Sequence, residues 1–258
     1  MKKILFLGYS PKETKIIDKL KENKNYQIFN TKNKIKLKNL DNINLVISFG
    51  YRHIISEDIL KKKKNIINLH ISYLPYNKGA HPNFWSFAEN TSSGVTIHKM
   101  DKGIDTGNII YQKLLDFELN KNRRKLTFKK TYTTLISEIE NLFIINSKNL
   151  LNNEYDEFEQ IGSGTYHNSN ELPVILKSWN QNIFNTINKY NREKNDNINK
   201  KLKLLNEIEK TRKKNNVNWM NILRHSIKNS PSKTLKILDS INSDDDIISK
   251  LFKKLNEK

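Results

Sequence analysis

The sequence lacks several features that common protein classes need. It contains no cysteine, which excludes a disulfide scaffold, a thiolate zinc site and a cysteine nucleophile. Its apolar start, Ile4–Leu7, is too short for a signal peptide, and no run approaches the roughly 18 apolar residues of a membrane span. The 258 residues suffice for one sizeable core, or for a core with a small appendage. We therefore expect a cytoplasmic protein with no membrane span.

Acidic residues are few compared with basic ones. There are 46 Lys and Arg against 27 Asp and Glu, a formal net charge of +19. Such a charge is typical of proteins that bind nucleic acids or nucleotides. However, the Lys residues are mostly scattered among acids, with clusters only at 61–64, 123–125 and 212–214, and Lys, Asn and Ile are abundant throughout. Compositional bias is therefore the favoured explanation of the positive charge, and binding to a polyanionic partner remains the alternative.

Short apolar runs alternate with amphipathic stretches in the first 151 residues. Strands are predicted at residues 3–9, 26–29, 45–49, 66–71, 95–100 and 108–112. Helices are predicted at 11–23 and 127–151, where apolar residues recur at helical spacing. This alternation is typical of an α/β fold with a doubly wound, mostly parallel sheet. Ligands of such sheets bind at the carboxyl ends of the strands.

The composition changes near residue 185. Residues 186–258 have no glycine, one proline and 18 Lys and Arg against 9 Asp and Glu, a net charge of +9. Sparse apolar residues predict two or three short helices near 198–213, 217–226 and 235–254. We expect a core domain at 1–185 and a basic helical C-terminal extension at 186–258. Helices this weakly amphipathic need a surface to pack on, such as the core, another protein or a second subunit in a homodimer.

Three polar residues near predicted strand ends can support acyl transfer to an amine. Asn68 and His70 alternate across Leu69, so on a strand they share one face. Asp105 lies in the turn 103–107, whose glycines permit close backbone approach. A carboxylate can orient a histidine, and an asparagine amide can donate to an oxygen that becomes negative. Taken alone, a strand histidine and an aspartate in a glycine turn are commonly structural.

Two longer motifs resemble the hallmark of the folate-dependent formyltransferases. They are NLHISYLPYNKG at 68–79 and GVTIHKMDKGIDTG at 94–107, and the likeness covers about residues 1–180. This family includes methionyl-tRNA and glycinamide ribonucleotide formyltransferases. The resemblance implies that Asn68, His70 and Asp105 are the catalytic trio, that 10-formyltetrahydrofolate is the formyl donor, and that no metal is needed. His98 is expected to be structural or to support the site rather than to react.

The resemblance also implies a mechanism and a folate site. The substrate amine attacks the formyl carbon, Asn68 and protonated His70 stabilise the oxyanion, and Asp105 orients His70 and takes the amine proton. Two segments, 49–55 and 100–107, are expected to hold the pteridine largely through backbone groups. The implied folate-binding residues are Phe49, Gly50, Tyr51, Arg52, His53, Ile54, Met100, Asp101, Gly103 and Ile104.

A closer likeness is to the branch that formylates amino sugars attached to nucleotides. It rests on LGY at 7–9, SFGYRHII at 48–55, PYNKGAHPNFWSF at 75–87 and GTYH at 164–167. Members of this branch act on aminodideoxyhexoses linked to dTDP, UDP or GDP. The implied substrate-binding residues are Tyr76, Lys78, Asn83, Trp85, Tyr166 and His167. Two alternatives are equally favoured: Trp85 packs in the core instead of binding substrate, and Lys78 is only solvated.

The sequence differs from this branch at two places, and two other functions are alternatives to formylation of a sugar. Asn170-Glu171 stand where the branch has Lys-Asp, and residues 186–258 lie outside the region that resembles the family. A methionyl-tRNA formyltransferase would use the positive charge for phosphate contacts, but its second domain is β-rich, whereas residues 186–258 are helical in pattern. A non-enzymatic, basic nucleic-acid-binding protein would not need the intact trio. The favoured function is N-formyl transfer to a nucleotide-linked amino sugar.

Overall fold

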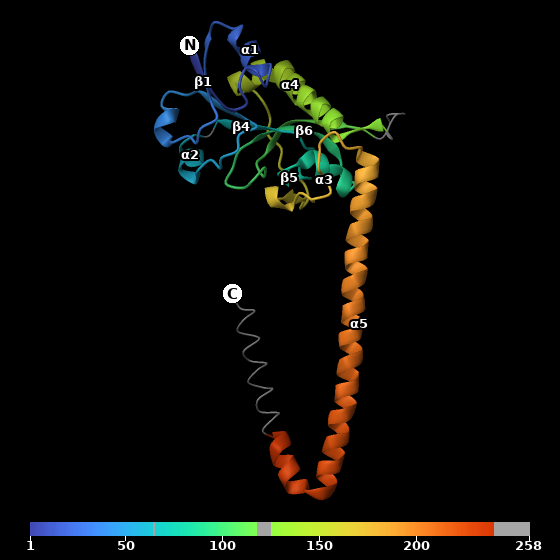
Figure 1. Ribbon diagram of the computed structural model, residues 1–258. Helices are drawn as coiled ribbons and strands as arrows, with labels where there is room; N and C mark the ends of the chain where they lie inside the picture. Colours follow the sequence, from blue (N-terminus) through green and yellow to red (C-terminus); the bar gives the residue numbers. More distant parts are fainter. Residues whose placement is uncertain (64, 118–124, 240–258) are drawn as a thin grey trace. The chain divides into compact units, whose positions relative to one another are not determined.

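The computed structural model describes residues 1–63, 65–117 and 125–239, and its N-terminal unit is built on a six-stranded sheet (Figure 1). The strands are β1 (Lys2–Gly8), β2 (Tyr26–Thr31), β3 (Leu45–Phe49), β4 (Ile66–His70), β6 (Ser93–Lys99) and β7 (Ile109–Leu115), in the order β2-β1-β3-β4-β6-β7. The first four are mutually parallel, whereas β6 runs antiparallel to both β4 and β7. The predicted mostly parallel sheet is confirmed, with an antiparallel hairpin at one edge.

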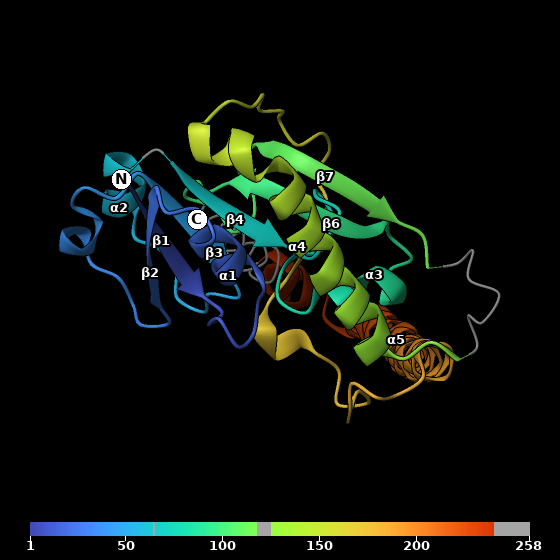
Figure 2. The ribbon, with the colours of Figure 1, turned by 90° about the horizontal axis from the view of Figure 1, so that it is seen from above.

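Helices cover both faces of this sheet. They are α1 (Ile16–Lys21), α2 (Glu57–Lys62), α3 (Pro82–Ala88) and α4 (Phe128–Asn152). Short 3-10 turns lie at Leu37–Leu40, between β2 and β3, and at Ser169–Glu171. Helix α4 lies across one face (Figure 2) and begins one residue after the predicted start. The side chain of Thr127 caps it by accepting a hydrogen bond from the Lys130 amide.

Helix α1 is shorter than the predicted span 11–23. Residues before it form turns instead, because the Ser10 amide donates to the Glu13 carboxylate at 2.9 Å. The Thr14 hydroxyl donates to the buried Glu140 of α4 at 2.7 Å, which fixes where the helix can start. Short polar side chains that bond to nearby backbone compete with helix in this way.

Alternation along the strands builds the two halves of the core. Ile4, Phe6, Ile47 and Leu69 face α1 and α4, where they meet buried side chains such as Phe143. The intervening residues point to the other face. Leu5, Leu7, Val46 and Ile66 pack there with Ile59 of α2. Asn68 and His70 alternate with Leu69, so they belong to this second face.

A third apolar cluster joins α3 to the beginnings of two other helices. Its buried members are Phe84, Trp85, Phe128 and Ile183, and Ile187 and Tyr190 pack against them. A two-stranded parallel sheet contacts this cluster, with β5 (Lys78–Gly79) paired to β8 (Tyr166–His167) and the His167 ring stacked on that of Trp85. These contacts hold the segment that follows β4.

The C-terminal part is one helix where the sequence predicted separate ones. Helix α5 runs without a break from Ile183 to Asn229, so the predicted gap between 198–213 and 217–226 is wrong. Asn- and Lys-rich stretches interrupt the apolar face of a helix, which is why the sequence predicted a gap. Only glycine and proline disfavour a helix strongly, and neither residue occurs within α5. Residues 231–239 are also helical, and the rest of the predicted helix 235–254 lies outside the described residues.

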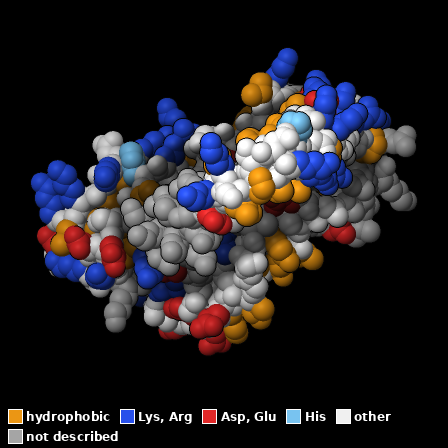
Figure 3. All heavy atoms as spheres, turned by 90° about the horizontal axis from the view of Figure 1, so that it is seen from below, with side chains coloured by type: hydrophobic (Ala, Val, Ile, Leu, Met, Phe, Trp, Pro, Cys, Tyr) orange, Lys and Arg blue, Asp and Glu red, His pale blue; other side chains and the backbone are white. Residues whose placement is uncertain are grey.

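The chain separates into two compact units, Met1–Arg192 and Glu193–Lys258, and the division at residue 185 stays a prediction. In the parts that the structure describes, no helix is long and apolar enough to cross a lipid bilayer. Lys and Arg side chains form several separate groups with acidic side chains among them (Figure 3). Of the predicted basic clusters, Lys64, Arg123 and Arg124 lie outside the described residues.

Candidate active site

Strand β4 and the β6–β7 loop bring the predicted catalytic trio together. The Asn68 amide nitrogen Nδ2 donates to Asp105 Oδ1 at 3.1 Å. The His70 ring nitrogen Nδ1 lies 3.6 Å from the other oxygen, Asp105 Oδ2. Both Asp105 and His70 are nearly inaccessible, with side-chain exposures of 11% and 8%. One carboxylate therefore touches an amide and an imidazole in a place that excludes most water.

The loop holds Asp105 in an uncommon backbone conformation. Its φ is +54°, in the left-handed region that non-glycine residues rarely adopt. The Asp101 carboxylate organises the loop by accepting from the Gly103 amide at 3.0 Å and from the Thr106 hydroxyl at 2.6 Å. The Gly79 amide of β5 donates to Asp105 Oδ2 at 2.9 Å. Left-handed aspartates cluster at functional sites when the surroundings stabilise them.

His98 is a fourth member of the cluster. The register of β6 places it directly opposite Asn68, and it is 1% exposed. Its Nε2 lies 3.4 Å from Asp105 Oδ1 and 3.2 Å from Asn68 Nδ2, while its Nδ1 lies 2.7 Å from the Lys99 carbonyl. Because a carbonyl only accepts, Nδ1 carries a hydrogen and donates to Lys99, while Nε2 faces both Asn68 and Asp105. This position agrees with the expected supporting role.

Gln160 also contacts the cluster, and sequence reasoning missed it. Its amide Nε2 donates to the carbonyl oxygens of Asp105 at 2.8 Å and of Gly107 at 2.9 Å. It lies 55 residues beyond Asp105 in a connecting segment, where no periodic pattern marks a contact. For His98 a signal did exist, because Thr96 and His98 alternate along a predicted strand.

Burial and neighbouring charges act in opposite directions on the pKa values of the central pair. Burial lowers the pKa of His70 below its ordinary value, although the Asp105 charge acts in the opposite direction. Burial alone would raise the pKa of Asp105, but attraction by His70 and His98 and the bond from the Gly79 amide hold it far below the ordinary value. An ionised Asp105 beside a neutral His70 is therefore favoured near neutral pH.

The predicted folate-binding residues lie after β3 and after β6, beside the trio in the sheet order. Arg52, His53, Ile54, Asp101, Gly103 and Ile104 are exposed, whereas Tyr51 and Met100 are half-buried. Phe49 is different, because it is 2% exposed and its ring meets the Tyr9 ring edge-on at 4.7 Å. Gly50 adopts a φ of +67°, which lets the chain turn away after β3. A ligand could reach the exposed members, and the folate role stays a prediction.

Three predicted substrate-binding residues are accessible. Tyr76 and Tyr166 are 37% and 45% exposed, and Lys78 of β5 pairs in register with Tyr166 of β8. The Lys78 ammonium reaches the Ser163 carbonyl at 3.4 Å, and the Tyr166 hydroxyl donates to Asn168 at 2.9 Å. Tyr76, Lys78 and Tyr166, called the strip below, lie near Gly79 in the chain or through the Lys78–Tyr166 pairing, and the Gly79 amide contacts Asp105.

The other three predicted substrate-binding residues are buried and have partners within the protein. Asn83 donates to the Phe128 carbonyl and accepts from the Thr131 hydroxyl, both at 2.8 Å. The rings of Trp85 and His167 stack with centroids 3.8 Å apart. The His167 ring nitrogens lie 3.0 Å from the Glu89 carboxylate and 3.1 Å from that of Glu171, one of the two residues that depart from the branch. Their substrate role stays a prediction, and their observed contacts are hydrogen bonds, imidazole–carboxylate contacts and ring stacking within the protein.

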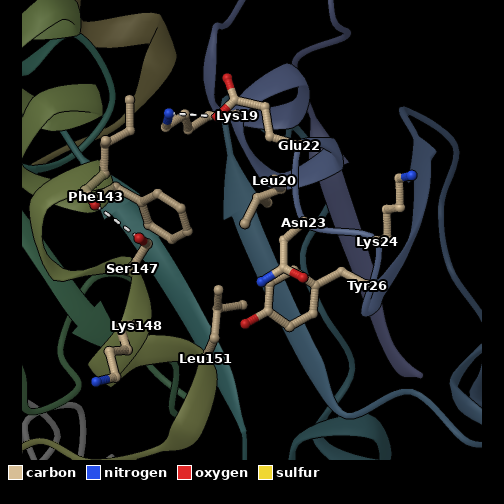
Figure 4. Close-up of a pocket in the computed structure, with 11 residues that line it drawn as sticks. Lys19, Leu20, Glu22, Asn23, Lys24, Tyr26, Phe143, Ser147, Lys148 and Leu151 are labelled. Atoms are coloured by element: carbon tan, nitrogen blue, oxygen red, sulfur yellow. Dashed lines mark hydrogen bonds and ion pairs between the residues drawn. The ribbon is translucent and has the colours of Figure 1, made fainter.

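A hollow of about 500 Å³ lies elsewhere, between α1, the start of β2 and α4 (Figure 4). Leu20, Phe143 and Leu151 form its apolar lining, and Lys24 and Lys148 are among its polar residues. It lies at the amino ends of the strands, and no predicted site residue lines it. Among residues 1–63, 65–117 and 125–239, no group of three His, Asp or Glu side chains is placed to hold a metal ion.

Curated relatives resemble part of this chain. The bifunctional polymyxin resistance protein ArnA of Wigglesworthia glossinidia brevipalpis is 34% identical over 170 residues, which are 62% of this chain and 25% of that protein. GDP-perosamine N-formyltransferase of Brucella melitensis is 30% identical over 142 residues, 53% of this chain and 52% of that enzyme. The chain thus spans a quarter to about half of the length of these relatives.

A solved structure resembles the chain over nearly its own whole length. It is the formyltransferase PseJ from Anoxybacillus kamchatkensis, in complex with UDP-4,6-dideoxy-4-formamido-L-AltNAc and tetrahydrofolate, with 35% identity and a TM-score of 0.64. The similarity covers 97% of PseJ and 72% of this chain. Residues 3–131, half of this chain, also match the profile of the family described as Formyl transferase. The chain therefore belongs to the formyl transferase family.

Proposed function

We propose that this protein transfers a formyl group from 10-formyltetrahydrofolate to the amine of a nucleotide-linked amino sugar. The observation that carries the proposal is the contact of Asn68 and His70 with Asp105, at the carboxyl end of β4. It occurs in a chain that is 35% identical to PseJ, whose structure holds tetrahydrofolate and a UDP-linked formamido sugar. In α/β sheets of this kind, ligands bind at the carboxyl ends of the strands.

In the proposed reaction, the substrate amine attacks the formyl carbon and the formyl oxygen becomes negative. Asn68 stabilises that oxygen by turning one of its two N–H bonds away from its present partners, Asp105 and His98. The amine loses one proton and N10 of the folate gains one as the C–N10 bond breaks. The products are a formamide and tetrahydrofolate.

His70 is the proposed carrier of that proton. In the mechanism expected from the sequence, His70 is already protonated before the amine attacks. Burial instead favours the neutral ring. A neutral ring can take the proton from the attacking amine, and Asp105 then stabilises the charged ring. His98 keeps the Asp105 carboxylate and the Asn68 amide in place.

The proposed folate and sugar-nucleotide sites are based on the exposed side chains around the trio. The segments 49–54 and 100–104 are proposed to hold the pteridine, with Ile54 and Ile104 as apolar contacts that are 79% and 43% exposed. The strip of Tyr76, Lys78 and Tyr166 is proposed to hold the nucleotide-linked sugar, with the ammonium of Lys78 facing the diphosphate. Helical residues stand where a tRNA-directed enzyme has a β-rich domain, which favours a sugar acceptor over tRNA.

The cytoplasm is the proposed location, because both co-substrates are charged metabolites of that compartment. A homodimer is also proposed, supported by apolar side chains of α5 such as Leu205 and Trp219, both 59% exposed. Cell fractionation and light scattering test these two points.

An acceptor assay tests the proposed function. Purified protein is given 10-formyltetrahydrofolate with UDP-, GDP- or dTDP-linked amino sugars, or with charged initiator tRNA, and tetrahydrofolate and formamide are measured. We expect formylation of at least one sugar nucleotide, no reaction with the tRNA, and loss of activity in His70→Ala. Formylation of the tRNA alone would move the protein to the tRNA-directed enzymes. No formylation of any amine would leave the non-enzymatic alternative.

A further inference from the structure

Gln160 directs all of its side-chain hydrogen bonds at one loop. Its Nε2 donates to the Asp105 carbonyl at 2.8 Å and to the Gly107 carbonyl at 2.9 Å. Since carbonyl oxygens only accept, the nitrogen end of the amide must face the loop. In the described parts of the chain, the buried Oε1 of Gln160 has no hydrogen-bond partner. The polar contacts of this side chain are thus the two that clamp the residues on either side of Thr106.

Those two bonds act on a strained backbone. Asp105 has a φ of +54°, and such a conformation persists only where neighbouring groups stabilise it. Its carboxylate is held separately, by Asn68 at 3.1 Å and by the Gly79 amide at 2.9 Å. Without Gln160, the described structure gives the Asp105 carbonyl no other side-chain donor, and the peptide could rotate toward a commoner conformation. The carboxylate would move with it.

Gln160 itself is firmly placed. Just before it, Phe158 forms an isolated bridge with Ile109, with amide-to-carbonyl bonds of 2.7 and 2.9 Å. Just after it, the Thr165 hydroxyl accepts from the Asn77 amide at 2.8 Å, and the Thr165 carbonyl accepts from the Lys78 amide at 2.9 Å. The segment 158–167 therefore ties the Asp105 loop to the segment that carries Gly79.

We infer that Gln160 is a positioning residue for the proposed formyl transfer. It keeps the Asp105 carboxylate against Asn68 and His70 by holding the left-handed backbone of the loop, and it does not touch the reacting atoms. This inference rests on the proposed function. If Gln160 were purely structural, its replacement would change stability alone. If Gln160 positions Asp105, its replacement lowers the rate of formyl transfer within the enzyme–substrate complex.

Gln112 provides a matched control. Its Nε2 also makes two bonds, to the Leu74 carbonyl at 2.8 Å and to the Thr96 hydroxyl at 3.0 Å, and it is half-buried like Gln160. Gln160→Met is expected to lower kcat by about 10- to 100-fold while KM for both substrates stays within about three-fold, since a misplaced group slows the bound complex. Gln112→Met is expected to keep kcat within about two-fold.

A double-mutant cycle separates positioning from an independent effect. In an Asp105→Asn background, where the catalytic carboxylate is already lost, Gln160→Met should have little further effect on kcat. An equal fold-loss in both backgrounds would overturn the inference, and so would a Gln160→Met enzyme with wild-type kcat.

Two further measurements keep the inference testable if Gln160→Met does not fold. Gln160→Glu retains the size of the side chain but places a carboxylate oxygen against the two carbonyl oxygens unless the carboxyl group is protonated. The kcat of this variant relative to wild type should therefore rise as pH falls.

Amide hydrogen exchange at Gly79, which donates to Asp105, should be faster in Gln160 variants and unchanged in Gln112→Met. Unchanged exchange in a folded Gln160 variant would overturn the inference. If wild type transfers no formyl group, the proposed function fails, and this exchange result still decides whether Gln160 holds Asp105.

Discussion

Asn68 shows how much one side chain can contribute at this site. Its amide nitrogen lies between Asp105 Oδ1 at 3.1 Å and His98 Nε2 at 3.2 Å, so its orientation is set ahead of substrate binding. Both of its N–H bonds have partners, so one of them must be released when charge develops on a bound oxygen, and the amide is then already beside that oxygen. The amide is therefore the most direct candidate for stabilising an oxyanion.

Replacing Asn68 tests that role. In Asn68→Ala we expect kcat to fall by about 100- to 1,000-fold, which is typical for loss of one oxyanion donor. Stability should change much less, which thermal unfolding of both proteins would check. An Asn68→Ala enzyme that turns over at nearly the normal rate would remove Asn68 from the mechanism.

The protonation of His70 determines the expected pH dependence. Its pKa is lowered by burial, so the neutral, proton-accepting ring persists below its ordinary pKa of about 6.5. Activity should therefore decline only as pH falls through this lowered pKa. Asp105 raises the pKa of His70, so in Asp105→Asn the ring should titrate at still lower pH. The measurement is the titration of the His70 ring by NMR in both proteins, together with the pH profile of kcat/KM. A ring that titrates above its ordinary value, or identically in both proteins, would contradict this assignment.

Among the elements, the two-stranded sheet also contacts the site, although β4 carries Asn68 and His70. Strands β5 and β8 have two residues each, and the Gly79 amide of β5 also donates to Asp105. Gly164, just before β8, packs so closely that an added Cβ would lie 2.0 Å from the Pro75 carbonyl oxygen. Its φ is +62°, which further disfavours any side chain.

Gly164→Ala should therefore separate β8 from the segment that follows β4. We expect the free energy of unfolding to fall by about 3 kcal/mol or more, through strain and a backbone clash, with a loss of kcat/KM. Gly162→Ala is the control, because Gly162 also has a positive φ, +89°, but an added Cβ there meets nothing within 4 Å. Its expected loss is about 1–2 kcal/mol, from conformation alone. Chemical denaturation of both variants measures the difference, and equal losses would mean that the contact with Pro75 is unimportant.

For the whole molecule, the question is how much of the helical C-terminal part the catalytic unit needs. The compact unit ends at Arg192, beyond the predicted limit at residue 185. The residues between contribute to packing, since the Tyr190 ring lies 5.8 Å from that of Phe84 and Ile187 joins the same cluster. A chain cut at 185 would lose both side chains.

Two truncations test this boundary. A chain that ends at 192 should keep measurable formyl transfer, with changes limited to stability or oligomeric state. A chain that ends at 185 should be less stable by about 2–4 kcal/mol, because two large side chains leave an apolar cluster. The measurements are kcat/KM, thermal unfolding and light scattering. If the longer form stays folded and binds folate but transfers no formyl group, residues 193–258 contribute to the acceptor site.

Local patterns in the sequence were sufficient for the strands, for α4 and for the family. Strand alternation is a property of neighbouring residues, so the pattern alone places Asn68 and His70 on one face. The motifs at 68–79 and 94–107 are continuous stretches of chain, so they could be read from the sequence, and the trio that they predict does lie together. The antiparallel hairpin at the edge was not foreseen, because periodicity does not give strand direction.

Only the tertiary structure decided what depends on distant partners. Gln160 and His98 join Asp105 because the topology brings the connecting segment and β6 to the end of β4. Trp85 and His167 lie against each other, although an aromatic ring that packs and one that binds a ligand look the same in a sequence. The sequence by itself determined which chemistry-bearing residues this protein has and which of them share a strand face. Which groups touch Asp105 depended on long-range packing, because a hydrogen bond requires two atoms within about 3 Å and sequence spacing does not specify that distance.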